Sequence, residues 1–141
     1  MKTQIFVSAV TANSGKTLFA MGLSRALKKL GMKVQPFKCG PDFQDPQLLS
    51  IVSNYETINL DLWMATPTRL QHIYNTYGDQ ADVCITEGVG GLYDGYKRMQ
   101  GSSAEIANYL NLPVVLMINA RVAGYSVAPI IYGFKNFYSG I

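Results

Sequence analysis

Short apolar runs alternate along the chain with segments whose apolar residues recur every three or four positions. The runs predict four buried strands, over 4–10, 33–38, 81–86 and 113–119. The segments between them predict five helices, over 16–30, 47–53, 67–77, 102–110 and 126–132. This alternation predicts a doubly wound α/β fold, in which a mainly parallel sheet carries helices on both faces. Because the chain ends with only four predicted strands, the sheet looks unfinished, and we expect a truncated fragment of a longer polypeptide.

Residues at two predicted helix ends agree with this interpretation. Gly31 follows the first helix and is a typical stop residue, because glycine adopts the left-handed backbone that ends a helix. Ser102 or Ser103 can cap the helix over 102–110, and Glu105 is placed to complete a capping box.

Composition narrows the class of protein. The 141 residues are 48% hydrophobic and 15% charged, which suits one globular domain and excludes a disordered chain. The net charge of +3 comes without any run of like charges, so no nucleic-acid-binding tail is indicated. The longest apolar stretch, 113–118, is far shorter than a membrane span, and the start lacks a signal-peptide pattern, so we expect a cytoplasmic protein. Cys39 and Cys84 have no metal-ligand spacing and are expected to be reduced thiols.

The loop over 9–17 carries the clearest chemical signal. It reads Ala-Val-Thr-Ala-Asn-Ser-Gly-Lys-Thr and lies between a predicted strand and a predicted helix. Backbone N–H groups of such a loop surround phosphates, its lysine reaches the β- and γ-phosphates, and its threonine hydroxyl binds Mg²⁺. This arrangement indicates a P-loop NTPase type of domain that binds ATP. The residues expected to hold the nucleotide are Ala12, Asn13, Ser14, Gly15, Lys16 and Thr17, the last of them also binding Mg²⁺.

The same loop departs from the usual pattern G-x-x-x-x-G-K-[ST], because Val10 stands where the first glycine is expected. Ala9 takes the glycine position of a variant loop one residue longer, so its backbone must tolerate a Cβ. The alternative interpretation of the segment is a plain helix N-terminus after a turn.

Acidic residues at the carboxyl ends of predicted strands are candidate magnesium ligands. Asp42 and Asp45 follow the second strand and Glu87 ends the third, and these ends meet at the ligand-binding edge of a parallel sheet. Aspartate beside proline is also a common turn residue, which is the alternative for both aspartates. Glu87 has a weaker alternative, because a carboxylate on an apolar strand is costly unless it is paired or metal-bound.

Two further residues are candidates for catalysis. Lys38 closes the second strand, where its ammonium group can neutralise a transferring phosphoryl group; the alternative is a solvated strand end. Asp94 lies in the glycine-rich loop over 88–95 and is placed for substrate contact or proton transfer; the alternative is a solvated turn residue.

Other reactive or aromatic side chains give weaker signals. His72 is expected to be a surface residue, and Trp63 suits packing better than stacking on a ligand. Neither Cys39 nor Cys84 lies in a nucleophile turn, so no glutaminase chemistry is expected from this chain.

Four segments, 35–46, 59–61, 87–95 and 102–107, follow one another in order, in a match that spans nearly the whole chain. Among them are Pro-Phe-Lys-Cys-Gly-Pro-Asp, Asn-Leu-Asp and Glu-Gly-Val-Gly-Gly-Leu-Tyr-Asp-Gly. Together they closely resemble the cobyrinic acid a,c-diamide synthase family, which belongs with dethiobiotin synthetase among P-loop ligases. Members of that family are much longer and carry a glutaminase domain after the synthetase domain. The resemblance therefore implies that 1–141 is the N-terminal part of an ATP-binding synthetase domain, without its glutaminase.

The family resemblance implies a reaction and a set of partners. ATP with Mg²⁺ phosphorylates the a- and c-acetate carboxylates of cobyrinic acid, a tetrapyrrole (corrin) diacid, and glutamine-derived ammonia attacks each acyl phosphate, in cobalamin biosynthesis. The roles implied are phosphate binding for Lys16 and Thr17, a place near the γ-phosphate for Lys38, magnesium binding for Thr17, Asp45 and Glu87, and catalysis or intermediate release for Asp94. The departures are Ala9, in place of a loop glycine, and Gly90, where the family often has a larger residue.

Two alternatives remain beside this interpretation. A partitioning or cell-division ATPase of the same superfamily would act as a switch, but such proteins have a second lysine where this chain has Thr11. The chain could also bind nucleotide without completing an amidation. The sequence leaves open which tetrapyrrole is the substrate, cobyrinate, hydrogenobyrinate or nickel-sirohydrochlorin, and it leaves open the oligomeric state, a homodimer included. No nucleic acid or membrane partner is expected.

Overall fold

The computed structural model describes residues 2–121 and 123–141. In this part of the chain, the strands form one parallel sheet with the order β3-β2-β4-β1-β5. The strands are β1 (Thr3–Ala9), β2 (Val34–Cys39), β3 (Ile58–Leu60), β4 (Val83–Glu87) and β5 (Val114–Met117). The helices are α1 (Lys16–Lys29), α2 (Gln44–Ser53), α3 (Pro67–Gly78), α4 (Ser103–Tyr109) and α5 (Val127–Phe137).

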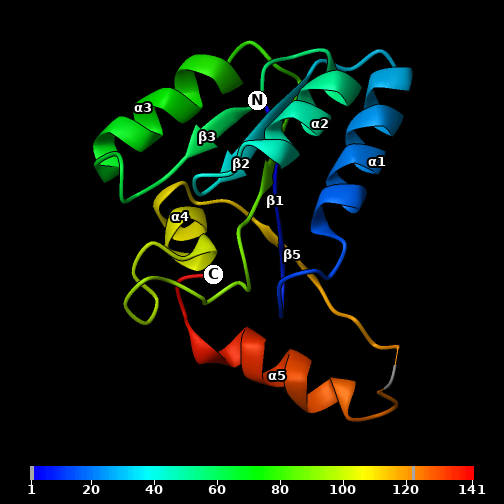
Figure 1. The fold of residues 1–141 in the computed structure, drawn as a ribbon, viewed down its shortest axis with the longest axis vertical. Coiled ribbons are helices and arrows are strands. Elements are labelled where there is room, and N and C mark those ends of the chain that lie inside the picture. The colour runs from blue at the N-terminus through cyan, green and yellow to red at the C-terminus, as the bar shows by residue number, and fades with distance from the viewer. Residues whose placement is uncertain (1, 122) are drawn as a thin grey trace.

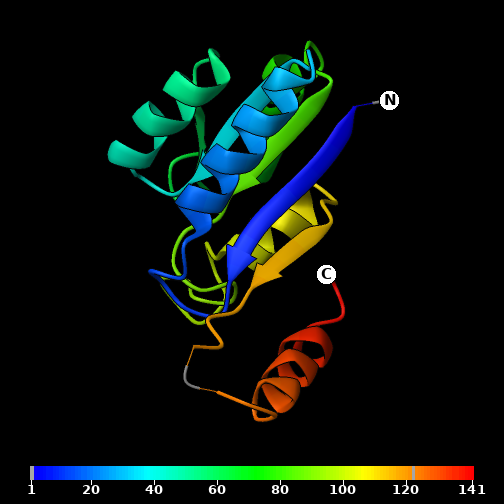
Figure 2. The ribbon, with the colours of Figure 1, turned by 90° about the vertical axis from the view of Figure 1, so that its right-hand side faces the viewer.

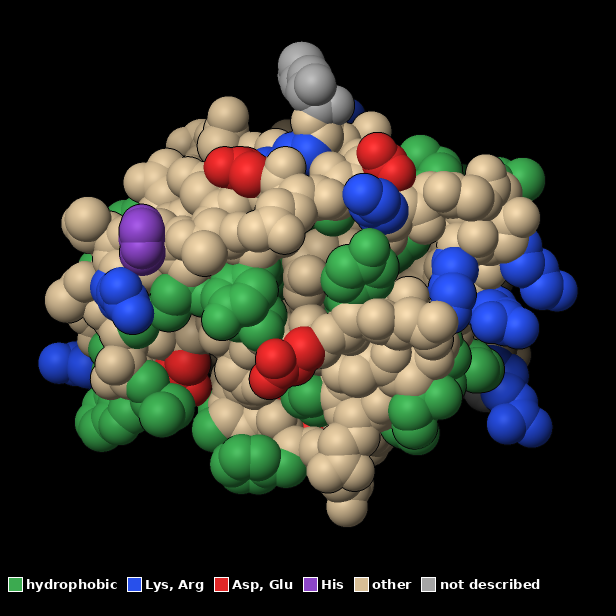
Figure 3. All heavy atoms as spheres, turned by 90° about the horizontal axis from the view of Figure 1, so that it is seen from above, with side chains coloured by type: hydrophobic (Ala, Val, Ile, Leu, Met, Phe, Trp, Pro, Cys, Tyr) green, Lys and Arg blue, Asp and Glu red, His purple; other side chains and the backbone are tan. Residues whose placement is uncertain are grey.

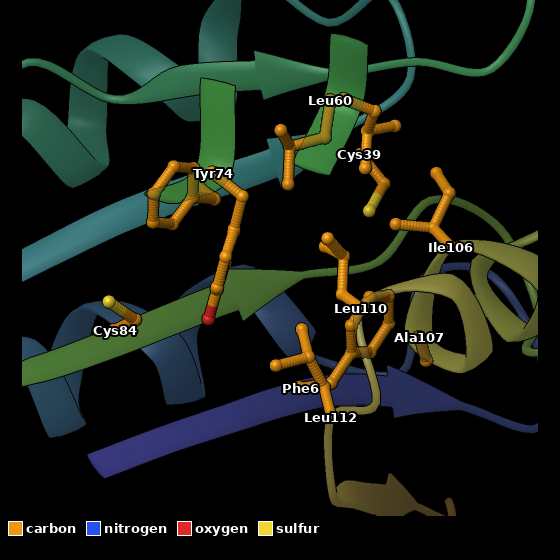
Figure 4. Close-up of a cluster of buried hydrophobic side chains, with 11 residues drawn as sticks. Phe6, Cys39, Leu60, Tyr74, Cys84, Ile106, Ala107, Leu110 and Leu112 are labelled. Carbon is orange, nitrogen blue, oxygen red and sulfur yellow. The ribbon is translucent and has the colours of Figure 1, made fainter. Parts of the chain in front are cut away.

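Helices cover both faces of the sheet (Figures 1 and 2). On one face, Val7, Val34 and Ile85 pack with Ala20 of α1 and Leu49 of α2. The opposite face has its own core cluster, built from the sheet, α3 and α4. Figure 4 shows the side chains of this cluster, among them Phe6, Leu60, Tyr74, Ile106 and Leu110. The predicted doubly wound α/β fold is confirmed.

Successive residues of β1 show why both faces need apolar side chains. Phe6 belongs to the cluster under α3 and α4, and Val7 belongs to the cluster under α1 and α2. Because side chains alternate across a strand, a strand covered on both faces reads as a continuous apolar run. Both residues are fully buried.

Two local predictions were wrong. The sheet contains β3, which the prediction of four strands omitted; its three residues, Ile58–Leu60, are too few to give a periodic signal. The helix predicted over 47–53 begins at Gln44 instead. Its start is fixed by Asp42, whose Oδ1 accepts the N–H groups of Gln44 at 2.9 Å and Asp45 at 3.2 Å.

The predicted ends of α1 and α4 are confirmed. Gly31 has a φ of 84° and donates its N–H to Lys28 at 3.0 Å, as a glycine ending a helix does. Ser102 Oγ accepts the N–H of Glu105 at 3.2 Å, and Glu105 Oε2 accepts the N–H of Gly101 at 2.5 Å. Ser102 thus satisfies an N–H group that a helix start leaves free, whereas Glu105 accepts from Gly101, one residue before the N-cap N–H that a capping box would use.

The last helix, α5, lies beyond the carboxyl edge of the sheet (Figures 1 and 2). Tyr93 connects it to the rest of the chain: its hydroxyl donates to the carbonyl of Phe134 at 2.6 Å, and the two rings stack 5.2 Å apart. None of the helices in the described ranges combines the length and the apolar character that a membrane crossing requires. Figure 3 looks onto the opposite end of the molecule, where both acidic and basic side chains reach the surface.

Candidate functional site

The loop between β1 and α1 turns through two residues with left-handed backbone, Asn13 (φ 57°) and Gly15 (φ 85°). Asparagine and glycine are the residues that adopt this conformation most readily. Ala9 is not one of these positions: it is the last residue of β1, and its carbonyl accepts the N–H of Leu92 at 2.8 Å. Alanine in place of the usual glycine is thus accommodated by a strand conformation that a Cβ permits.

The N-terminus of α1 follows this loop directly, and its first backbone N–H groups have no partner inside the helix. Gly15 is its N-cap, and within the described residues no side chain caps it and no acidic residue lies in its first turn. The first N–H groups of a helix lack partners inside the helix and carry partial positive charge, which favours an anion there. Ser14 closes the loop by donating its hydroxyl to the carbonyl of Thr11 at 2.8 Å.

Four charged or polar side chains meet at the carboxyl ends of β2 and β4. Lys38 Nζ lies 3.0 Å from Glu87 Oε1 and 2.6 Å from Asp45 Oδ2. The hydroxyl of Thr17 donates to the same Glu87 Oε1 at 2.6 Å. The side chains of Lys38 and Glu87 are only 4% and 1% exposed, so this ion pair is largely shielded from water.

The second carboxylate oxygen of Glu87 has no such partner. Oε2 is buried and accepts no hydrogen bond from the part of the chain that the structure describes. A buried acceptor without a partner costs about 1–3 kcal/mol, and more when it is charged. A cation bound at this oxygen would remove that cost.

The donor set fits Mg²⁺. Thr17, Asp45 and Glu87 offer hydroxyl and carboxylate oxygens, which this ion prefers, and nucleotide phosphates and water usually complete its shell. Among the described residues, no three His, Cys, Asp or Glu side chains gather as a metal cluster. In addition, Lys38 stands between the two carboxylates, so a bound metal would compete with its ammonium group.

Burial and charge act together on the titration of these groups. Burial alone would lower the pKa of Lys38, but its hydrogen bond to Asp45 and the charge of Glu87 raise that pKa above its ordinary value. Burial raises the pKa of Glu87, despite the opposing effects of Lys38 and Thr17. The pKa of Lys16 is lowered, mainly by burial and then by the positive charge of Lys38.

Lys16 connects the loop over 9–17, called the phosphate loop below, to the glycine-rich loop over 88–95. Its Nζ donates to the carbonyl of Gly90 at 2.6 Å. Ser103, at the start of α4, holds the neighbouring residue: its Oγ donates to the carbonyl of Val89 and accepts the N–H of Val89, each at 2.9 Å. A Cβ at Gly88 would lie 2.6 Å from Ser103 Oγ, so only glycine allows this close approach.

These groups surround a cavity of about 480 Å³, a volume within the roughly 300–1,000 Å³ of small-ligand sites. It is lined by the six residues predicted to hold the nucleotide, 12–17, and by Lys38, Asp42, Asp45, Glu87 and Val89 among others. The structure thus brings together every predicted site residue except Asp94. The carboxylate of Asp94 accepts the N–H of Gly91 at 3.0 Å and lines a neighbouring cavity.

Sequence reasoning missed two residues that position the site. Asn59 donates to the carbonyls of Gly40 at 2.8 Å and Asp42 at 3.1 Å, which fixes the loop after β2. Ser103 was considered only as a helix cap, whereas it holds Val89. A polar residue between two apolar residues, as Asn59 is, was the available signal.

Solvent exposure tests the predictions for the histidine, the tryptophan and the two cysteines. His72 is exposed, as predicted. Trp63, which was predicted to pack rather than to stack on a ligand, contacts the ring of Tyr96 but is 75% exposed. Cys39 and Cys84 are buried and unpaired in the described structure, and burial raises the pKa of both thiols.

Known proteins similar to this chain carry related names. It is 42% identical over 135 residues to a cobyrinate a,c-diamide synthase of Dehalococcoides mccartyi and 39% identical over 138 residues to one of Saccharolobus solfataricus. A hydrogenobyrinate a,c-diamide synthase of Brucella anthropi is 36% identical over 132 residues. These matches cover 94%, 98% and 93% of this chain, which spans 29%, 31% and 30% of the relatives' lengths. The resemblance that the motifs indicated is confirmed.

Among solved structures, the hydrogenase maturation factor HypB from Archaeoglobus fulgidus matches 96% of this chain and 91% of its own, with a TM-score of 0.46 and 12% identity, a likeness too distant to bear on the fold. The family model described as "CobQ/CobB/MinD/ParA nucleotide binding domain" matches residues 5–129. That range contains every residue of the cavity described above. The chain therefore belongs to the CobQ/CobB/MinD/ParA nucleotide binding domain family.

Proposed function

We propose that this chain binds ATP and Mg²⁺ and phosphorylates carboxylates of a corrin diacid, as the ATP-binding part of a cobyrinate a,c-diamide synthase in cobalamin biosynthesis. The substrate class comes from the three relatives named above, which are a,c-diamide synthases of cobyrinate or hydrogenobyrinate. Glutamine-derived ammonia would come from a glutaminase domain outside this chain.

One observation carries the proposal. Two lysines, three carboxylates and a helix N-terminus converge on one cavity, and a buried oxygen of Glu87 has no partner among the described residues. Phosphoryl transfer needs positioning and charge neutralisation rather than a protein nucleophile, and these groups supply both.

The phosphate loop would bind the nucleotide as follows. Residues 12–17, which include the α1 N-terminus, line the cavity, and their N–H groups would surround the phosphates. Lys16 would exchange its hydrogen bond with Gly90 for the β- and γ-phosphates. The γ-phosphate end of ATP would then lie against the glycine-rich loop.

Lys38 would act at the transferring group. Its ammonium group is held at the cavity by Asp45 and Glu87, and its raised pKa keeps it charged at neutral pH. Magnesium, when bound at Thr17, Asp45 and Glu87, would neutralise charge on the phosphate oxygens. Lys38, displaced from these acids, would neutralise the charge that remains.

The reaction balances without a protein nucleophile. A substrate carboxylate oxygen bonds to the γ-phosphorus, the bond from that phosphorus to the β,γ-bridging oxygen breaks, and ADP leaves. Ammonia then bonds to the acyl carbon, the bond from that carbon to the phosphate oxygen breaks, and the proton that the nitrogen loses goes to the leaving phosphate. The N–H groups and lysines of the chain only hold charge in these steps.

Hydroxylamine trapping tests the proposal. The chain is incubated with ATP, Mg²⁺, cobyrinic acid and hydroxylamine, which converts an acyl phosphate to a stable hydroxamate detectable by mass. We expect hydroxamate from the wild type and none from Lys16→Ala, while Lys135→Ala, which changes a lysine on α5, retains it. ATP hydrolysis without hydroxamate would favour a nucleotide-driven switch and overturn the ligase assignment.

A further inference from the structure

A second cavity, of about 290 Å³, lies beside the phosphate site. Its lining includes Pro41, Trp63, Met64 and Tyr96, with Val89 and Asp94 toward the phosphate site. We infer that this cavity binds one face of the tetrapyrrole ring and directs an acetate side chain to the γ-phosphate. This inference rests on the proposed function, because it takes the substrate class from there.

The walls are apolar side chains left in contact with solvent. Trp63 is 75% exposed, Met64 77% and Tyr96 62%. The rings of Trp63 and Tyr96 meet edge to face, with centroids 5.2 Å apart and planes at 78°. Single exposed apolar residues are ordinary, but a group of them around a cavity is typical of a binding site.

The backbone fixes both aromatic residues before any ligand arrives. The N–H of Trp63 donates to Asp61 Oδ1 at 2.7 Å, and the N–H of Tyr96 donates to the carbonyl of Gln100 at 3.0 Å. The Tyr96 ring also lies directly against Gly101, where a Cβ would approach ring atoms to 2.7 Å. Such preorganisation reduces the entropy lost when a ligand binds.

The two cavities adjoin at the glycine-rich loop. Val89 lines both of them, and Asp94 of the second cavity accepts a hydrogen bond from Gly91, one residue after the Gly90 carbonyl that holds Lys16. Lysines of such loops bind the β- and γ-phosphates, so this side of the phosphate site is the γ end. The second cavity is therefore on the acceptor side and not on the nucleoside side.

The shape and charge of the cavity suit a flat, substituted macrocycle. Its volume is too small to enclose a tetrapyrrole, so a face or edge would rest on the aromatic wall while the remainder stays outside. Asp61 and Asp94 already accept backbone N–H groups, which partly satisfies their charge. Lys97 and Arg98, exposed on the same turn as Tyr96, can pair with the outer carboxylates of the substrate.

Calorimetry with cobyrinic acid as the probe tests the inference, in the presence of Mg²⁺ and a non-hydrolysable ATP analogue. Trp63→Ala and Tyr96→Ala should each weaken cobyrinic acid binding by about tenfold or more, as the loss of an aromatic contact does. Trp63→Phe should recover part of the affinity, because it keeps a ring. Tyr77→Ala removes a half-exposed tyrosine on α3, outside both cavities, and should change nothing.

The outcomes separate this inference from the proposed function. No cobyrinic acid binding by the wild type, or unchanged affinity in both alanine variants, would overturn the inference. Weakened binding of the ATP analogue in Trp63→Ala would also overturn it, since it would place the adenine at this wall. Tight cobyrinic acid binding that depends on Trp63, without any hydroxamate formation, would instead support the inference and refute the proposed phosphorylation.

In the hydroxamate assay, a role in substrate positioning predicts a further distinction. Trp63→Ala should raise the KM for cobyrinic acid while kcat at saturation changes much less, because Trp63 lies outside the phosphate cavity. An equal loss of kcat and kcat/KM would contradict a role in binding the ring.

Discussion

Replacing Lys38 by methionine should destabilise the fold through Glu87. Methionine keeps much of the apolar stem of lysine but removes the ammonium group that lies 3.0 Å from Glu87 Oε1. Glu87 would retain one hydrogen bond, from Thr17, and its side chain is 1% exposed. The variant thus leaves a buried carboxylate without an opposite charge beside it.

The magnitude follows from the distance and the burial. Two unit charges 3.0 Å apart attract by about 5.5 kcal/mol at an effective dielectric constant of about 20. Part of this attraction only offsets the cost of removing the two charges from water, so the pair itself contributes less to stability. Removing Lys38 leaves the desolvation cost of Glu87 without compensation, so we expect the unfolding free energy to fall by about 3–5 kcal/mol at pH 7.

The loss should depend on pH in a defined direction. Burial already raises the pKa of Glu87, and removing Lys38 removes the charge that opposes this effect. In the folded variant Glu87 keeps its proton to a higher pH than in the unfolded chain, where its pKa is about 4.3. The stability of the variant therefore falls as the pH rises from the pKa of the unfolded chain to the higher pKa of the folded state. The difference from the wild type should therefore be largest at neutral pH and shrink on acidification. Lys38 itself stays protonated well above this range, because its pKa is raised in the folded state.

Denaturant unfolding at several pH values measures these differences. Lys38→Met with Glu87→Gln should recover much of the stability lost by Lys38→Met alone, because the buried charge is gone. Asp79→Asn is the control, since it breaks an ion pair with Lys2 at 2.7 Å in which Asp79 is 67% exposed, and it should cost at most about 1 kcal/mol. The reasoning fails if Lys38→Met costs no more than this control, or if its cost does not decline at acidic pH.

Three other predictions follow from the structure around the site. Gly91→Ala would place a Cβ 2.7 Å from the backbone carbonyl oxygen of Val10, which cannot move freely. Thermal unfolding should therefore show a loss of about 1–3 kcal/mol in unfolding free energy. A loss no larger than that of Gly22→Ala, whose Cβ would meet no atom within 4 Å, would contradict this. Ser103→Ala leaves both backbone groups of Val89 without their partner and should speed hydrogen exchange at that amide; unchanged exchange would dismiss the role of Ser103. Cys39 should react with a thiol reagent only on unfolding, because burial raises the pKa of its thiol, and rapid labelling of the native protein would contradict that burial.

Local pattern was sufficient for the parts of the site that lie close together in sequence. The phosphate loop is recognisable because a strand, a short loop and an amphipathic helix follow one another directly between residues 4 and 30. Glu87 stood out because a charge on an apolar strand requires a partner. Both arguments need only neighbouring residues and the general direction of strands in a parallel sheet.

Other features depended on tertiary structure that no local pattern contains. Strand β3 is three residues long and exists because β2 offers it an edge to pair with. Trp63 was predicted to pack, yet its place in the turn after β3 leaves it against Tyr96 and largely exposed to solvent. Asp94 follows Glu87 closely in sequence, but its carboxylate accepts the N–H of Gly91 and lines the second cavity.

The ion pair at the centre of the site shows why strand order matters most. Lys38 and Glu87 are 49 residues apart, and they meet because β2 pairs with β4 in a register that sets the two residues side by side. A sheet with β1 between these strands would separate them, although every strand would read the same in sequence. The carboxylate and the lysine are thus fixed by hydrogen-bonded strands, whereas Lys16 opens α1 and Asp94 lies in a loop. A rigid acidic centre bordered by adjustable loops is what a phosphoryl-transfer site needs, since the charges must be in place before a substrate closes the loops around them.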